Sequence, residues 1–194
     1  MQEAVPAGIG AMAAIIGCDE AVAEQICKEA VLPNEILSPA NFNSIGQIVI
    51  AGHKASVEAA LPLAKEKGAK MAVLLPVSVP SHCQLMMPAA EKLKINLNQI
   101  DFHSPSISII NNVGVKAYND AASIRDGLSH QLYMPVRWVE IIKMFISDGI
   151  TQIIECGPGK VLTGLNKRIE SQLELMSTSD IASLNALLQH ERSA

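Results

Sequence analysis

Short apolar runs and amphipathic helical patterns alternate over the first eighty residues, and their order restricts the fold more than any other feature. Helical periodicity is present over residues 19–30 and 54–67, with Asp19 placed to cap the first helix. Gly68 suits the end of the second helix, and the Asn-Ser-Ile-Gly sequence at 43–46 suits a hairpin turn. Strand-like apolar runs occupy residues 10–17, 36–42, 47–51 and 71–76.

The resulting order is β-α-β-β-α-β within about 70 residues, the split βαβ pattern of ferredoxin-like folds. It predicts an α/β fold in which residues 8–78 form a ferredoxin-like subdomain, with an antiparallel sheet and two helices on one face. Because residues 71–75 are all apolar, we expect the last strand to be buried.

After His82 the pattern changes to helices separated by single strands. This alternation favours part of a parallel sheet covered by helices. We therefore assign residues 1–7 and 79–170 to a second, incomplete α/β subdomain. Residues 171–194 form a polar tail, in which we expect one loosely docked helix. The predicted strands are residues 106–111 and 150–156, and the predicted helices are 85–97, 121–132, 136–147 and 160–169.

Composition excludes several classes of function. The 194 residues carry a net charge of −4 and 3% aromatic residues, without the basic stripe and stacking rings that nucleic-acid binding needs. No apolar run reaches the roughly 18–20 residues of a membrane span, and no signal-peptide pattern is present. The four cysteines lack metal-ligand spacing, so we expect no metal site, no disulfide framework and a cytoplasmic location.

His82 is the first candidate for chemistry. Pro76 and Pro80 end the preceding strand, so His82 lies at a strand-to-helix junction, where catalytic groups are often held. An imidazole there titrates near neutral pH and serves as a general base. The alternative is a histidine that caps a helix or bonds a neighbouring carbonyl. We interpret the adjacent Cys83 as structural, because neighbouring side chains diverge.

Two further motifs have both functional and structural interpretations. Gly157-Pro158-Gly159-Lys160 lies between a strand and a helix, which suits either anion binding or a tight turn. It lacks the full phosphate-loop pattern. Asn41 and Asn43 place two amides near a hairpin end, as ligands for a substrate or as turn formers. No pair of carboxylates has a spacing that suggests acid/base partnership.

Four sequence blocks occur together and resemble one family. They are Asn-Phe-Asn-Ser-x-Gly-Gln-x-Val-x-Ala-Gly at 41–52, Val-Pro-Ser-His-Cys-x-Leu-Met at 79–86, Gln-Leu-Tyr-x-Pro-Val-x-Trp at 131–138 and Glu-x-Gly-Pro-Gly-Lys-Val-Leu at 155–162. Together they resemble the malonyl-CoA:acyl-carrier-protein transacylases of bacterial fatty-acid synthesis. The resemblance extends from Met1 to about Ile169.

The resemblance implies a hydrolase-like α/β subdomain beside the ferredoxin-like one, and a ping-pong mechanism through a serine ester. His82 matches the family's general base, and Gln131 matches the position whose backbone carbonyl orients that base. Asn41 and Asn43 match a loop that faces the substrate cleft. The implied partners are malonyl-CoA and acyl carrier protein, with no cofactor, nucleic acid or membrane.

The departures from the family concern its nucleophile. The sequence lacks the Gly-His-Ser-Leu-Gly elbow, the arginine that binds the malonyl carboxylate and the glutamine loop of the oxyanion hole. Ile45 also occupies a position where the family commonly has proline. We therefore interpret the chain as a C-terminal portion whose N-terminal half is a candidate partner, and we expect it to be inactive and aggregation-prone alone. The alternatives are a non-catalytic carrier-protein-binding module and a thioester hydrolase.

Overall fold

The computed structural model describes residues 1–77 and 79–191 of the chain. Ser78, at the end of the first predicted subdomain, and residues 192–194, at the end of the predicted tail, lie outside the described residues. The chain divides into two compact units, Met1–Trp138 and Val139–Ala194.

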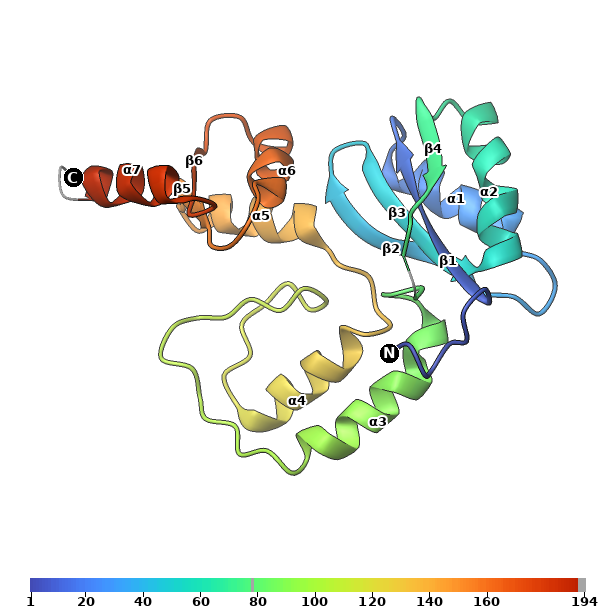
Figure 1. Cartoon of the computed structure of the whole chain (residues 1–194), viewed down its shortest axis with the longest axis horizontal. Coiled ribbons are helices and arrows are strands. Elements are labelled where there is room, and N and C mark those ends of the chain that lie inside the picture. Colours follow the sequence, from blue (N-terminus) through green and yellow to red (C-terminus); the bar gives the residue numbers. More distant parts are fainter. Residues whose placement is uncertain (78, 192–194) are drawn as a thin grey trace. The chain divides into compact units, whose positions relative to one another are not determined.

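The first unit begins with the six elements that the sequence predicts, in the predicted order (Figure 1). Their strands form one antiparallel sheet in the order β2-β3-β1-β4. The elements are β1 (Gly10–Ile16), α1 (Glu20–Ala30), β2 (Leu37–Ser44), β3 (Gln47–His53), α2 (Lys54–Glu66) and β4 (Met71–Leu74).

Local sequence signals explain where these helices begin and end. The Asp19 carboxylate accepts a hydrogen bond from the N–H of Val22 at 2.8 Å, which confirms the predicted cap of α1. Gly68 follows α2 with φ +92°, a left-handed conformation that favours glycine. The β2–β3 turn is tighter than predicted, because Ser44 already pairs with Gln47 and leaves only residues 45–46 in the turn.

Both helices pack on one face of the sheet and form the main core of the first unit (Figure 1). Ile26 of α1 and Ile50 of β3 are fully buried in it. Burying each such side chain contributes about 1.5–3 kcal/mol of hydrophobic free energy. The opposite face carries a smaller cluster, in which Met12 and Val49 pack with Cys83.

The prediction that residues 71–75 form a buried strand is wrong in its burial. In β4 only Ala72 is buried, whereas Met71, Val73 and Leu74 are exposed. The physical reason is position, because β4 is an edge strand with a sheet neighbour on one side only.

The rest of the first unit contains the short 3₁₀ helix η1 (Gln84–Met86), α3 (Met87–Leu97) and α4 (Ala121–His130). The predicted helices 85–97 and 121–132 are confirmed, with Pro88 in the first turn of α3. Val5 packs against Met86 and Ala89, so the N-terminal segment belongs with the helices rather than the sheet.

The predicted buried strand at residues 106–111 is also wrong. Only Ile110 forms a bridge, to Ala117, and the side chains of Ile107 and Ile109 are 79% and 64% exposed. Apolar alternation creates a strand only where another backbone is available to pair with it. Within residues 1–77 and 79–191 no such strand lies beside this segment.

The second unit contains helices and a two-stranded parallel sheet. It comprises most of α5 (Trp138–Ser147), then β5 (Gln152–Glu155), α6 (Val161–Ile169), β6 (Glu174–Ser177) and α7 (Ile181–Glu191). The predicted strand 150–156 and helices 136–147 and 160–169 are confirmed. The tail was expected to contain one helix, but it also contains β6, which pairs with β5 along its whole length. Four residues are too few to reveal a strand by periodicity.

Candidate active site

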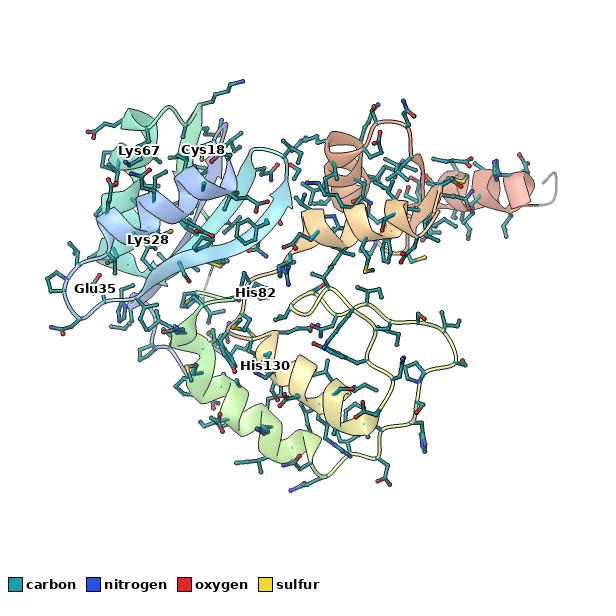
Figure 2. All side chains as sticks on the ribbon, turned by 180° about the vertical axis from the view of Figure 1, so that it is seen from behind. Cys18, Lys28, Glu35, Lys67, His82 and His130 are labelled. Carbon is teal, nitrogen blue, oxygen red and sulfur yellow. The ribbon has the colours of Figure 1, made fainter. Side chains whose placement is uncertain are left out.

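The loop that carries His82 is fixed by close packing against β1. Pro80 is fully buried, and a Cβ built on Gly10 would lie 2.3 Å from Pro80 Cγ, so only glycine permits this approach. The thiol of Cys83 donates to the Pro80 carbonyl at 3.2 Å. Figure 2 shows His82 where the chain leaves the sheet and enters α3, as its place in the sequence predicts.

The backbone of His82 is held in an uncommon conformation. Its φ is +61°, in the left-handed region that non-glycine residues seldom adopt. Its N–H donates to the carbonyl of Leu132 at 3.0 Å. Such strain costs about 1–3 kcal/mol and persists where surrounding contacts impose it, often at functional sites.

The imidazole of His82 is held in one tautomer. Its Nδ1 lies 2.8 Å from the carbonyl oxygen of Gln131, and a carbonyl only accepts, so Nδ1 carries the proton. The neutral ring therefore presents an unprotonated Nε2. Burial lowers the pKa of His82, against an opposing effect of hydrogen bonds to the backbone of Gln131 and Met134. The ring is thus an available base at neutral pH.

The carbonyl of Gln131 is available because it lies at the end of α4. The last carbonyls of a helix have no partner within it. Asp120 caps the start of α4 by accepting from the N–H groups of Ala122 and Ser123, and the Gln131 N–H still donates to Gly127. The next carbonyl, of Leu132, also bonds His82. The hydrogen bond from the His82 N–H to the Leu132 carbonyl was not predicted, because no local sequence signal connects positions fifty residues apart.

Asn41 is brought toward the same segment by β2. It forms a parallel bridge with Val136, a few residues beyond Gln131. A bulge at Ala40 places Asn41 opposite Val49 of β3. Because paired residues lie on the same face of a sheet, Asn41 lies on the face where Val49 packs with Cys83. Asn43 lies at a second bulge of β2, between Phe42 and Ser44, where it has no paired residue on β3.

Both asparagine side chains are half-buried. Neither amide makes a hydrogen bond within the described part of the chain. They are therefore candidates for ligand contacts rather than turn-forming amides already in use.

His82 will titrate below its ordinary pKa of 6.5 in the folded chain. Because the folded state then binds fewer protons than the unfolded state, His82 makes stability rise with pH across this window and fall as pH drops below 6.5. An NMR titration of the imidazole Cε1–H resonance measures the pKa. A value at or above 6.5 would contradict the burial of this ring.

Cys83 is not arranged as a nucleophile. It is buried with 1% exposure, and burial raises the pKa of its thiol to about 11, so the thiolate is rare at neutral pH. Its Sγ already donates to Pro80. These observations support the structural interpretation of this residue.

The Gly157-Pro158-Gly159 loop connects β5 to α6. The side chain of Glu155, the last residue of β5, binds the N-terminal end of α6. Its carboxylate accepts from the N–H groups of Leu162 and Thr163 and from the Thr163 hydroxyl at 2.7–3.1 Å. Burial opposes ionisation, but these hydrogen bonds outweigh it and lower the pKa of Glu155. The chain's own carboxylate therefore takes the place of an external anion, and the tight-turn interpretation is favoured.

Residues 1–77 and 79–191 contain neither a candidate metal cluster nor a membrane-spanning helix. No three histidine, cysteine or acidic side chains among them gather in a way that would hold a metal ion. No helix in these ranges has the length and apolarity that a membrane crossing requires.

A neutral imidazole fixed through Nδ1 is the form in which histidine can serve as the base of a nucleophile–histidine pair, the arrangement that hydrolases and acyltransferases share. Comparison with known proteins narrows this class. No family model matches the chain. The chain is 53% identical over 187 residues to the malonyl CoA-acyl carrier protein transacylase of Haemophilus influenzae, and 50% identical over 189 residues to that of Escherichia coli K12.

Solved structures agree with these sequence matches. An acyl carrier protein S-malonyltransferase from Vibrio cholerae superposes with a TM-score of 0.93 at 53% identity, covering 96% of this chain and 61% of that one. A malonyl-transacylase solved in complex with a type II PKS acyl-carrier protein gives 0.95 at 50% identity, covering 97% and 61%.

The matches cover nearly all of this chain but only part of each relative. They include 96% of this chain with the Haemophilus influenzae protein and 97% with the Escherichia coli protein. The chain spans about three fifths of the length of these relatives, 60% and 61% respectively. It is homologous to the C-terminal portion of malonyl CoA-acyl carrier protein transacylases, and its mixed α/β fold is theirs.

Proposed function

We propose that this chain is the histidine-bearing portion of a malonyl-CoA:acyl-carrier-protein transacylase of fatty-acid synthesis. The observation that carries the proposal is the 2.8 Å contact between His82 Nδ1 and the Gln131 carbonyl, in a chain about half identical to proteins of that name. This contact leaves Nε2 to act as the general base, with Gln131 as the group that orients it.

In the proposed reaction, His82 Nε2 takes the proton from the serine of the family's Gly-His-Ser-Leu-Gly motif, which this sequence lacks. The serine oxygen attacks the malonyl thioester, the carbon–sulfur bond breaks, and His82 returns the proton to the coenzyme A thiolate. His82 then deprotonates the phosphopantetheine thiol of acyl carrier protein. That sulfur takes the malonyl group, and the serine regains its proton.

The half-buried amides of Asn41 and Asn43 are proposed to contact the substrate. They suit this role because their hydrogen-bonding groups are not used within the described residues. Malonyl-CoA and acyl carrier protein are the proposed partners. All four cysteines are free, which supports a cytoplasmic location.

The finer division of the fold belongs to the same proposal. Residues 8–78 would be the ferredoxin-like subdomain, supported by their element order and sheet order. Residues 1–7 and 79–170 would be part of the hydrolase-like subdomain, supported by the packing of Val5 on Met86. Residues 171–194 would be a variable tail.

Intact mass after brief incubation with malonyl-CoA tests the function. The 194-residue chain alone should show no malonyl adduct, because it lacks the serine motif and the thiol of Cys83 is protonated. When the N-terminal portion of the Haemophilus influenzae transacylase is supplied, that portion should gain a hydroxylamine-sensitive malonyl group. Acyl carrier protein should then remove it.

Other outcomes would replace the proposal. An adduct on the 194-residue chain alone would place the nucleophile within this sequence. Carrier binding without any adduct in the complemented sample would indicate a binding module. Loss of malonyl-CoA to water without an acceptor thiol would indicate a thioester hydrolase.

A further inference from the structure

The turn that carries His82 is attached to the sheet on both sides of the histidine. On one side Pro80 is fully buried, with its ring against Gly10 at the start of β1. On the other side Cys83 is 1% exposed and belongs to the apolar cluster that includes Val49 of β3. The Cys83 thiol donates to the Pro80 carbonyl at 3.2 Å, which joins the two ends. His82 therefore occupies the middle of a turn whose ends rest on one sheet.

A second part of the first unit holds the same histidine. At the end of α4, the Leu132 carbonyl accepts from the His82 N–H at 3.0 Å, and the Gln131 carbonyl lies 2.8 Å from Nδ1. The φ of His82 is +61°, a strained conformation that persists only where surrounding contacts impose it. His82 thus connects the sheet to the end of α4, and the position of its turn on the sheet decides how well these hydrogen bonds are made.

Gly10 decides how closely the turn approaches the sheet. A Cβ built at this position would lie 2.3 Å from Cγ, 2.7 Å from Cδ and 2.9 Å from Cβ of Pro80. The proline ring is rigid and fully buried, so it cannot rotate away from an added atom. Gly10 does not have a positive φ, so glycine is needed here for space rather than for a special backbone conformation. Any side chain at position 10 would push the turn away from β1.

We propose that Gly10 is a positioning residue for the candidate base. By allowing Pro80 to pack directly on β1, it places the imidazole of His82 within hydrogen-bonding distance of the Gln131 carbonyl. The hydrogen bond at one ring nitrogen determines which nitrogen carries the proton. A displaced turn would lengthen the 2.8 Å contact and let the proton move to Nε2, and a ring protonated there cannot act as the base. The catalytic consequence rests on the proposed function, but the tautomer itself does not.

The tautomer of His82 tests the inference in the 194-residue chain without any catalysis. Nitrogen-15 chemical shifts of a neutral imidazole distinguish the protonated ring nitrogen from the unprotonated one, and His82→Gln assigns the signals among the five histidines. In the unaltered chain the proton should lie on Nδ1. In Gly10→Ala, the Nε2–H form should account for at least about half of the population.

Two control variants separate positioning from folding. Ile50→Ala destabilises the same sheet from the face that packs on α1 and α2, away from the turn, and it should keep the proton on Nδ1. Gly164→Ala makes the same chemical change in α6, where an added Cβ would meet no atom within 4 Å, and it should also leave the tautomer unchanged. A shift in Gly10→Ala alone therefore reports the position of the His82 turn.

Activity should follow the tautomer. In the chain complemented with the N-terminal portion of the Haemophilus influenzae transacylase, Gly10→Ala should lower kcat for malonyl transfer at least about tenfold, with KM for malonyl-CoA changed less than about twofold. Pro80→Ala removes Cγ and Cδ, the two atoms closest to the added Cβ. In that background Gly10→Ala should lower kcat by no more than about threefold further, because the two sites are in contact and their effects do not add.

A folded Gly10→Ala chain that keeps the proton on Nδ1 would overturn the proposal, and so would equal effects of Gly10→Ala with and without the ring of Pro80. If Gly10→Ala does not fold, Pro80→Ala decides, because it removes the packing on Gly10 without adding an atom. A pure Nδ1–H form in Pro80→Ala would then refute the positioning role. A tautomer shift without malonyl transfer in any complemented sample would uphold the role of Gly10 and refute only the proposed function.

Discussion

Replacing His82 with glutamine will lower malonyl transfer by about 100- to 10,000-fold in the chain complemented with the relatives' N-terminal portion. Glutamine preserves size and polarity but cannot accept and return a proton. The loss should appear in kcat, measured as the rate at which acyl carrier protein gains malonyl. We expect this loss because the hydrogen bond between Nδ1 and the Gln131 carbonyl leaves Nε2 unprotonated and able to accept a proton.

Two matched variants separate the base from its surroundings. His190→Gln makes the same change at a histidine that pairs with Glu174 in the second unit, and it should leave the rate nearly unchanged. Gln131→Ala removes a side chain but keeps the carbonyl that bonds His82, so it should retain most activity. Comparable rates for His82→Gln and the unaltered chain would refute the role of this histidine. A large loss in Gln131→Ala would move the orienting role to the side chain.

Replacing Ile50 with alanine will destabilise the first unit by about 2–5 kcal/mol. Ile50 is fully buried in the centre of the sheet, where β3 pairs with both β1 and β2. Its removal leaves a cavity against α1 and α2. Since domains are stable by only about 5–15 kcal/mol, the variant should unfold at markedly lower urea concentration.

Ile95→Ala is the control for this deletion. Ile95 is 62% exposed on α3, so the same loss of atoms should change stability by less than about 0.5 kcal/mol. Exchange of the β1 amides reports the unfolding of this unit alone. Equal effects of the two substitutions would mean that the cluster around Ile50 does not hold the unit together.

The sequence predicts the contacts around His82 to different degrees. The prolines around His82 predict its junction, and the family resemblance predicts the contact between His82 and the Gln131 carbonyl, which the structure contains. The left-handed backbone of His82 and its hydrogen bond to the Leu132 carbonyl were not predictable. They arise because the turn after α4 meets the loop that carries His82 only in the folded chain.

Two errors share one physical cause. Residues 71–75 and 106–111 were both predicted as buried strands from apolar runs, yet β4 lies at a sheet edge and residues 106–111 pair only at Ile110. An apolar run shows that a segment gains free energy by burial. It does not show whether another part of the same chain is there to bury it.

The sequence by itself determined the order and kind of most elements, because caps, turn glycines and apolar periods act over a few residues. Only the tertiary structure decided which segments are covered, which carbonyls reach His82 and that Glu155 closes the start of α6. These contacts join positions seven to fifty residues apart, and their free energy depends on packing that no local pattern encodes.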